Sequence, residues 1–210
     1  AAEDIVNGCT FDNNLPCIAE KEIVAVDSIA DELLHYMVSE QGCYMISKEE
    51  QDALTEVVLK GGRLNRKCVG RDAKTLLGMI GITVPDNIRC ITFEGPKEHP
   101  LIAEELMMPI LGVVRAKDFD DAVEQAVWLE HGNRHSAHIH SKNVDNITKY
   151  AKAIDTAILV KNGPSYAALG FGGEGYCTFT IASRTGEGLT SASTFTKRRR
   201  CVMTDSLCIR

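Results

Sequence analysis

The sequence predicts an α/β fold in which a mainly parallel sheet is flanked by helices. Short apolar segments with strand periodicity alternate with longer segments of helical periodicity over most of the chain. Helices between successive strands supply the crossover connections that parallel strands require. The chain has 210 residues, of which 44% are hydrophobic, and this is enough to bury one full core. We therefore expect one main domain built from βαβ units.

The first third of the chain shows helix boundaries as well as periodicity. A helix at the start is predicted to stop at Asn7-Gly8, because glycine favours the left-handed position after a helix. Ser28 and Ser47 each have an acidic residue three positions later, which is the spacing of a capping box. The expected elements are helix 1–6, strand 22–27, helix 28–41, strand 44–46 and helix 47–60.

The remainder continues the alternation up to Gly163 and then changes character. Asp118 is expected to cap a helix, and the segment 110–115 is a strongly apolar strand. Beyond Gly163 the chain has glycine-rich turns and two alternating segments, 178–182 and 193–202. The expected regular elements are helix 73–80, strand 89–93, strand 110–115, helix 118–130, strand 136–140, helix 144–154 and strand 157–160.

Composition excludes several classes of function. The net charge of −6 argues against a general role in binding nucleic acid or membrane surfaces. No apolar run approaches the ~20 residues that span a bilayer. The eight cysteines include no CxxC pair, so they do not resemble a zinc site or a disulfide scaffold. Free thiols in a reducing cytosol are the better interpretation.

Cys17 occurs in a setting that packing alone would not select. It follows Asp12, Asn13, Asn14, Leu15 and Pro16, residues that favour turns or disfavour helix. A predicted strand begins five residues later. The thiol is therefore expected on a bend that enters a strand, where backbone N–H groups can face a ligand. From these features alone, a reactive thiol and an ordinary core cysteine are equally good interpretations.

Five segments together resemble one enzyme family. They are FDNNLPCIAEK at 11–21, ELMMP at 105–109, VKNGPSY at 160–166, GGEG at 172–175 and TGEG at 185–188. The chain resembles the CoA-acylating branch of the aldehyde dehydrogenase superfamily, which includes the acetaldehyde and propionaldehyde dehydrogenases of bacterial microcompartments. The resemblance covers essentially the whole chain.

The resemblance implies roles for three residues. Cys17 is the nucleophile that forms a thioester with a short-chain aldehyde, and its own N–H belongs to the oxyanion hole. Glu105 holds the ribose hydroxyls of NAD. Because Glu104 is adjacent, this role could belong to Glu104 instead. Without the resemblance, Glu105 would be interpreted as a solvated acid at the entrance of a strand. Asn162 lines the substrate channel. CoA is the co-substrate that accepts the acyl group.

The resemblance also implies a domain organisation. Residues 1–182 correspond to the catalytic domain and residues 183–210 to a C-terminal oligomerisation segment, so a homo-oligomer is expected. A chain that opens inside a helix without an initiator Met is expected to be a fragment, and the family's nucleotide-binding domain is absent from it. Residence in the cytoplasm or inside a bacterial microcompartment, with shell or cargo proteins as partners, is implied by resemblance alone.

Three further patterns resemble functional motifs but are expected to have no functional role. Residues 170–175 satisfy GxGxxG, but a strand-like segment follows where the dinucleotide fingerprint requires a helix. The histidines 131, 135, 138 and 140 resemble a metal cluster, but a Gly-Asn break and the absence of supporting ligands argue against a metal. The run Lys197-Arg198-Arg199-Arg200 could contact CoA phosphates or a subunit, but a solvated edge is the simpler interpretation.

Two other functions stay open. One is a hydrolytic aldehyde dehydrogenase, in which water and not CoA releases the acyl group; the NNLPC pattern favours CoA. The other is a non-catalytic oligomerisation or assembly module, because a chain without a nucleotide domain is not expected to turn over by itself.

Overall fold

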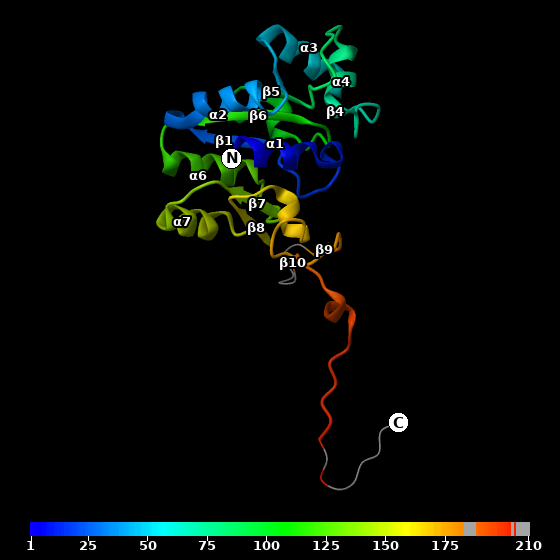
Figure 1. Cartoon of the computed structure of the whole chain (residues 1–210), viewed down its shortest axis with the longest axis vertical. Helices are drawn as coiled ribbons and strands as arrows, with labels where there is room; N and C mark the ends of the chain where they lie inside the picture. Colours follow the sequence, from blue (N-terminus) through cyan, green and yellow to red (C-terminus); the bar gives the residue numbers. More distant parts are fainter. Residues whose placement is uncertain (183–187, 203, 205–210) are drawn as a thin grey trace.

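A four-stranded parallel sheet forms the centre of the molecule, with its strands in the order β1-β6-β5-β2 (Figure 1). The computed structural model describes residues 1–182, 188–202 and 204. The four strands are β1 (Glu22–Val26), β6 (Ile110–Ala116), β5 (Cys90–Glu94) and β2 (Cys43–Met45). β6 is buried along almost its whole length because it lies in the middle of a sheet covered on both faces, which explains its unbroken apolar run. The predicted fold class is confirmed.

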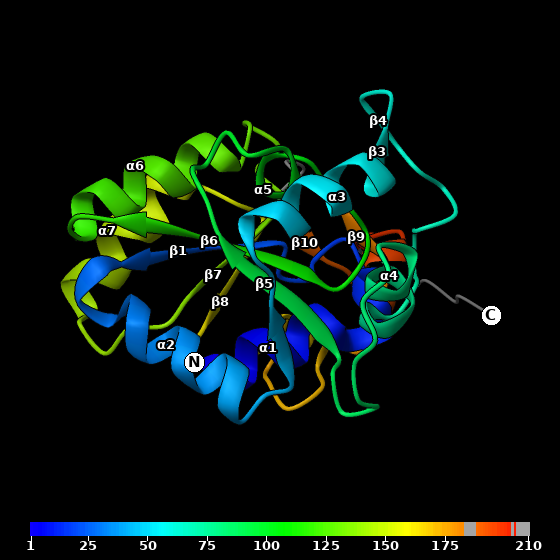
Figure 2. The same cartoon turned by 90° about the horizontal axis from the view of Figure 1, so that it is seen from above.

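Helices cover both faces of this sheet (Figure 2). α1 (Ala2–Thr10) and α2 (Asp27–Ser39) pack on one face around a core that includes Val6, Met37 and Leu111. The helices of the other face are α3 (Lys48–Val58), α4 (Ala73–Met79), α5 (Pro100–Ala103) and α6 (Phe119–Leu129). α5 approaches β6 so closely that a Cβ added at Gly112 would lie 2.2 Å from Ile102. This contact fixes α5 and the segment that follows it.

A second, two-stranded parallel sheet lies beneath the main one (Figure 1). Its strands are β7 (Ser136–Ile139) and β8 (Ile158–Lys161), joined by the crossover helix α7 (Val144–Ile154), which packs against α6. The smaller elements are the 3-10 turns η1 (Phe11–Asn14), η2 (Ser165–Leu169) and η3 (Ala192–Phe195) and the short strands β3 (Leu59–Lys60), β4 (Arg63–Leu64), β9 (Ile181–Ala182) and β10 (Gly188–Leu189). No helix in the described part of the chain is long and apolar enough to cross a membrane.

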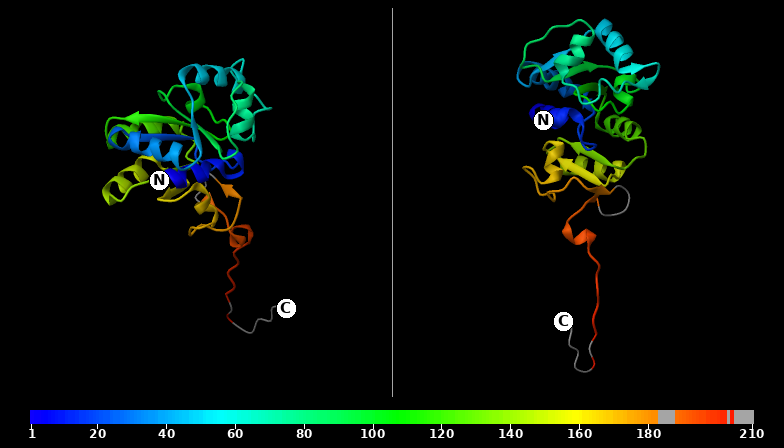
Figure 3. Two further views of the ribbon diagram at one scale, coloured as in Figure 1. Left: turned by 45° about the horizontal axis from the view of Figure 1, so that its top comes forward. Right: turned by 90° about the vertical axis from the view of Figure 1, so that its right-hand side faces the viewer.

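The C-terminal segment extends away from the body of the molecule (Figures 1 and 3). Of the predicted alternating segment 193–202, the first residues form η3, and the described residues 196–202 pair with no strand. Phe195 and Val202 are 70% and 78% exposed. Most of the TGEG motif at 185–188 lies outside the described residues. The oligomerisation role of 183–210 stays a prediction, as does the domain boundary at 182.

Most helix boundaries are as predicted, and two expectations are wrong. α1 does not stop at Asn7-Gly8 but continues to Thr10. Gly8 is instead required inside the helix, because a Cβ there would lie 2.0 Å from the carboxyl group of Glu20. The capping box at Ser47 is present, whereas the one at Ser28 is not: α2 begins at Asp27, and the expected partner Asp31 pairs with Arg115 instead.

Candidate active site

Cys17 lies on an exposed turn between η1 and β1. The N–H of Ala19 donates to the carbonyl of Pro16 at 3.0 Å and closes the turn. Ile18 and Ala19 are buried, so the chain enters the core directly after the exposed cysteine. The N–H groups of Cys17 and Ile18 donate to no backbone carbonyl among the described residues. A thiol with two free donors beside it is the arrangement that stabilises an oxyanion formed on the sulfur's substrate.

The loop before Cys17 has a left-handed backbone at three successive residues. The φ angles of Asp12, Asn13 and Asn14 are 47°, 50° and 64°. Asp and Asn tolerate this region better than other non-glycine residues, which is why this sequence can adopt the loop. A run of three such residues persists only where the surroundings hold it. The Asn13 side chain contributes by donating to the carbonyl of Gly70 at 3.0 Å.

Asn14 is the buried centre of this loop. Its Nδ2 donates to the carbonyl of Cys9 at 3.0 Å and to the carbonyl of Glu20 at 2.7 Å. Its Oδ1 accepts from the ammonium of Lys21 at 3.0 Å. One side chain thus joins the end of α1 to both ends of the Cys17 turn, and the position of the thiol is set by buried hydrogen bonds.

Glu105 lies near the Cys17 loop, although it is 88 positions after Cys17 in sequence. The Nζ of Lys21, which bonds Asn14, is 3.5 Å from Oε1 of Glu105. A second link follows two residues later, where the carbonyl of Met107 accepts from the N–H of Gly70 at 2.9 Å. The Glu105 side chain is 55% exposed, so its carboxylate can accept further hydrogen bonds. The structure thus brings Glu105 and the cysteine loop together, and the ribose-binding role stays a prediction.

Asn162 occupies the end of β8, and its side chain is engaged. Its Oδ1 accepts from the N–H of Ser141 at 2.8 Å, and its Nδ2 donates to the carbonyl of Ser141 at 2.8 Å. With its own φ at 52°, Asn162 clamps the chain after β8 to the chain after β7. Its predicted place in the wall of a substrate channel stays a prediction.

Glu20 is a residue near the site that the sequence analysis did not single out. It is only 5% exposed, and its Oε1 accepts from the N–H of Ser165 at 2.8 Å. Burial raises the pKa of this carboxyl group to about 7. In sequence, Glu20 is one of several acidic residues close to the start of β1. Gly8, whose lack of a side chain makes space for the Glu20 carboxyl group, is twelve positions upstream. No local pattern connects the two.

The structure places most residues of the three patterns that were expected to have no functional role. The loop 170–175 folds back on η2, and a Cβ at Gly175 would lie 1.9 Å from the carbonyl of Ala168, so its glycines serve close packing. Among the described residues, no three metal-ligating side chains form a group that could hold an ion. Residues 197–200 are exposed and make no ion pair within the described part of the chain.

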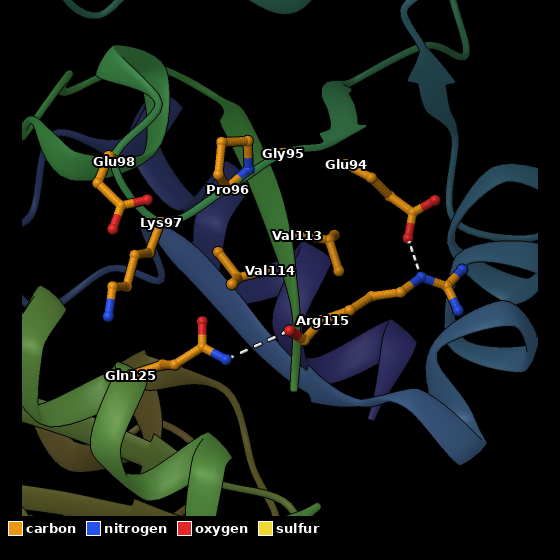
Figure 4. Close-up of a pocket in the computed structure, with 9 residues that line it drawn as sticks. All are labelled: Glu94, Gly95, Pro96, Lys97, Glu98, Val113, Val114, Arg115 and Gln125. Atoms are coloured by element: carbon orange, nitrogen blue, oxygen red, sulfur yellow. Dashed lines mark hydrogen bonds and ion pairs between the residues drawn. The ribbon is translucent and has the colours of Figure 1, made fainter. Parts of the chain in front are cut away.

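A cavity of about 490 Å³ lies at the carboxyl ends of β5 and β6 (Figure 4). The Cys17 turn precedes β1 and therefore belongs to the other end of these parallel strands. Arg115 and Lys97 are its cations. The Arg115 guanidinium is already paired with Glu94, Asp27 and Asp31, and Lys97 lies over the Trp128 ring at 5.1 Å. Because its principal cation is neutralised by three carboxylates, the cavity has little to attract an anion, and we place the candidate site at Cys17.

This fold and an exposed cysteine placed before a strand are the features to compare with known proteins. The aldehyde dehydrogenase family profile matches residues 87–196, and the chain belongs to that family. The chain is 46% identical over 212 residues to the acetaldehyde dehydrogenase (acetylating) of Salmonella typhimurium, a match that covers 98% of this chain and 45% of the relative. The chain thus spans about half the length of the curated relatives that it matches.

Solved structures agree with this assignment. A propionaldehyde dehydrogenase from the fucose utilisation bacterial microcompartment of Clostridium phytofermentans is 82% identical, with a TM-score of 0.94 over 100% of this chain and 48% of its own. Two single variants of the same protein have also been solved, one with alanine replacing the cysteine at its position 269 and one with alanine replacing the histidine at its position 387. A propionaldehyde dehydrogenase from Rhodopseudomonas palustris, solved with bound CoA and an acylated cysteine, is 55% identical with a TM-score of 0.92 over 96% of this chain and 46% of its own.

Proposed function

We propose that this chain supplies the catalytic part of a CoA-acylating aldehyde dehydrogenase. The reaction converts a short-chain aldehyde, NAD and CoA to acyl-CoA and NADH. The exposed Cys17 turn with its two free N–H groups carries the proposal, because it offers both a nucleophile and an oxyanion site. The acylated cysteine of the Rhodopseudomonas relative supports a covalent step on sulfur.

The first step that Cys17 performs is addition to the aldehyde. Its thiolate forms a carbon–sulfur bond with the carbonyl carbon, and the carbonyl oxygen becomes an oxyanion. The N–H groups of Cys17 and Ile18, which donate to no backbone carbonyl among the described residues, would donate to that oxygen. Nicotinamide, when bound, accepts the hydride that leaves the former carbonyl carbon. Cys17 then holds the acyl group as a thioester, and the CoA thiolate displaces the Cys17 thiolate to form acyl-CoA.

The residues present fit part of a dinucleotide site. The exposed carboxylate of Glu105 has the two acceptor oxygens that vicinal ribose hydroxyls require, and Lys21 fixes one of them beside the cysteine loop. Relatives have been solved with CoA and with NADP⁺ bound. We propose that Glu105 holds the nicotinamide ribose and that the remaining contacts come from the half of the relatives that this chain does not span.

His135 is a further candidate for this site. The histidine and cysteine replaced in the Clostridium relative are 118 positions apart, and the same interval separates His135 from Cys17 here. His135 directly precedes β7, is half-buried, and has its Nδ1 3.1 Å from Oγ of Ser136. An imidazole is a side chain that can accept the proton of an attacking thiol. We propose this role for His135.

The names of the relatives favour CoA over water as the acyl acceptor, since they are acetylating or acylating enzymes. We further propose a homo-oligomer in which the C-terminal segment contacts another subunit, supported by the exposure of Phe195 and Val202 on a segment that extends from the body. Residence in a microcompartment is proposed from the Clostridium relative alone.

The proposal is tested by replacing Cys17 in the full-length enzyme, meaning a polypeptide of the relatives' length that contains this chain. Cys17→Ala should abolish both aldehyde oxidation and thioester exchange with CoA. The variant should stay folded, because removal of one exposed thiol changes stability by about 1 kcal/mol or less. The matched control is Cys177→Ala, another exposed cysteine, which should retain activity. Turnover of Cys17→Ala within tenfold of wild type would show that another residue carries the covalent step.

A further inference from the structure

Glu20 connects two parts of the candidate site that are far apart in sequence. Its Oε1 accepts from the N–H of Ser165, 145 positions away, at 2.8 Å. Glu20 is three residues after Cys17, and Ser165 is the first residue of η2. Both residues are almost completely buried, at 5% and 1% exposure. The bond therefore ties the Cys17 turn to η2 from inside the protein, where water does not compete.

Packing shows what this bond would hold in place. Ile18, next to Cys17, is buried in a cluster with Ala168 and Leu169 of η2. The loop 170–175 returns against η2, and Phe171 of that loop contacts the Tyr166 ring with centroids 5.4 Å apart. A shift of η2 would therefore move the loop 170–175 and the surface beside the thiol together.

The presence of the Glu20 carboxyl group inside the protein reduces the stability of the fold in two ways. Helix α1 must carry glycine at position 8, since a Cβ there would lie 2.0 Å from Oε2 and 2.3 Å from Oε1 of Glu20. Glycine inside a helix is destabilising by roughly 0.5–1 kcal/mol relative to alanine. Oε2 is buried and has no hydrogen-bond partner among the described residues. An apolar side chain of similar size would fill the same space without a buried, unpartnered oxygen atom.

The electrostatic surroundings leave the carboxyl group able to titrate near neutral pH. The titratable groups that act on it are Asp4 on α1 and Tyr166 on η2. The ammonium of Lys21, its neighbour in sequence, is engaged by Asn14 and Glu105 instead. Burial is the largest cause of its raised pKa, and the carboxylate of Asp4 acts in the same direction. The hydrogen bonds to Ser165 oppose this shift, because they favour the ionised form.

We propose that Glu20 is a positioning residue that holds η2 and its following loop against the Cys17 turn, and that its ionised form does so more firmly than its neutral form. The inference rests on the proposed function, in which the thiol must meet an aldehyde in a defined geometry. Misplacement of reacting groups by about 1 Å can reduce a rate on the order of a hundredfold. A charge-assisted bond is also stronger than a neutral one.

The test compares three variants of the full-length enzyme: Glu20→Gln, Glu20→Leu and Gly8→Ala. Glu20→Leu should lower kcat by about 10- to 100-fold with a smaller change in KM. Glu20→Gln keeps an acceptor oxygen, so at pH 6 it should match wild type. At pH 8, where only wild type is ionised, kcat of Glu20→Gln should be about fivefold lower. Gly8→Ala displaces the carboxyl group from the helix side and should behave like Glu20→Leu.

The matched control is Glu22→Gln, two residues further on. Burial also raises the pKa of the Glu22 carboxyl group to about 7, but no bond to Ser165 is lost in this variant. Its pH profile should keep the wild-type form. The rate of Cys17 alkylation by iodoacetamide, measured at pH 6 on the same preparations, should fall in Glu20→Leu and Gly8→Ala and should match wild type in Glu20→Gln.

Two outcomes separate this inference from the proposed function. Wild-type enzyme that has no CoA-dependent aldehyde oxidation would overturn the function, whatever the variants do. Active wild type, together with a folded Glu20→Leu or Gly8→Ala that has unchanged kcat and unchanged alkylation, would overturn the positioning role. The same conclusion would follow if Glu20→Gln and Glu22→Gln altered the pH profile equally, since the effect would then be one of nearby charge.

Discussion

The ammonium of Lys21 donates to Oδ1 of Asn14 at 3.0 Å, inside the loop that presents Cys17. The same nitrogen lies 3.5 Å from Oε1 of Glu105. A single side chain, 18% exposed, therefore connects the predicted nucleophile loop to the predicted ribose ligand. The Nδ2 of Asn14 also donates to the carbonyls of Cys9 and Glu20. A substitution at Lys21 is therefore expected to change the conformation of the whole loop.

Lys21→Met should destabilise the fold and loosen the cysteine loop. It leaves the buried Oδ1 of Asn14 without a donor, which costs about 1–3 kcal/mol. Denaturant unfolding of the chain measures this change. The matched control is Lys48→Met, because the ion pair of Lys48 with Asp52 is exposed and worth about 0.3–0.5 kcal/mol. Equal losses in both variants would show that the Lys21–Asn14 bond contributes nothing beyond a surface charge.

Glu105→Gln should separate the two half-reactions of the full-length enzyme. Hydride transfer requires the nicotinamide ribose to be held, so it should fall by about 10- to 100-fold, consistent with the loss of a charge-assisted bond. Thioester exchange between Cys17 and CoA needs no nicotinamide and should be spared. Parallel assays of NADH formation and of acyl exchange measure the two. Equal loss of both activities would place Glu105 in a structural role. Glu104→Gln is the control, because it tests whether the adjacent residue holds the ribose in place of Glu105.

Cys17 should be the thiol that a limiting alkylating agent modifies first. Cys9, Cys43, Cys68 and Cys90 are buried, with exposures of 2% or less, so the described competitors are the exposed Cys177 and Cys201. Cys17 differs from these two because buried hydrogen bonds of Asn14 hold its turn, and the N–H groups of Cys17 and Ile18 have no backbone partner among the described residues. Peptide mass spectrometry after partial labelling gives the order of reaction. Faster labelling of Cys177 or of a buried cysteine would contradict the prediction.

The stability of the chain should decrease in acid because of His138. Burial lowers the pKa of its imidazole to about 4, and its Nε2 is buried without a partner among the described residues. The unfolded chain, with an ordinary pKa near 6.5, binds the proton more readily than the folded chain. The stability that this histidine contributes is therefore present above pH 6.5 and is lost as the pH falls towards 4.

His138→Leu should remove this dependence. Relative to wild type, the variant should gain up to about 3 kcal/mol on going from pH 7 to pH 4, which corresponds to the cited shift in pKa. Unfolding curves at half-unit pH steps measure the difference, and His35→Leu on the exposed surface of α2 is the control. The comparison with wild type at each pH is needed because Glu20 and Glu22, whose pKa values are raised, act in the opposite direction. A constant difference between variant and wild type would contradict the prediction.

The sequence by itself was sufficient for the arrangement of elements along the chain. Periodicity placed β1, β6 and α7 to within a residue or two, because local hydrogen bonding and the burial of one face or both leave a direct record in the order of apolar residues. The capping box at Ser47 was predictable for the same reason, since both partners lie within one turn of helix. The turn at Cys17 was also predictable, because Asp, Asn and Pro act on the backbone nearest to them.

Only the tertiary structure decided which groups meet across the sheet and between the sheets. Gly8 was interpreted as a helix end, whereas its lack of a side chain serves Glu20, and Asp31 was interpreted as a cap, whereas it pairs with Arg115 from β6. The bonds from Glu20 to Ser165 and from Lys21 to Asn14 and Glu105 likewise join segments that sequence order does not connect. The physical reason is the same in each case: a local pattern records what a residue does to its own backbone, but a buried charge or a close contact depends on partners that only chain folding brings within a few ångströms.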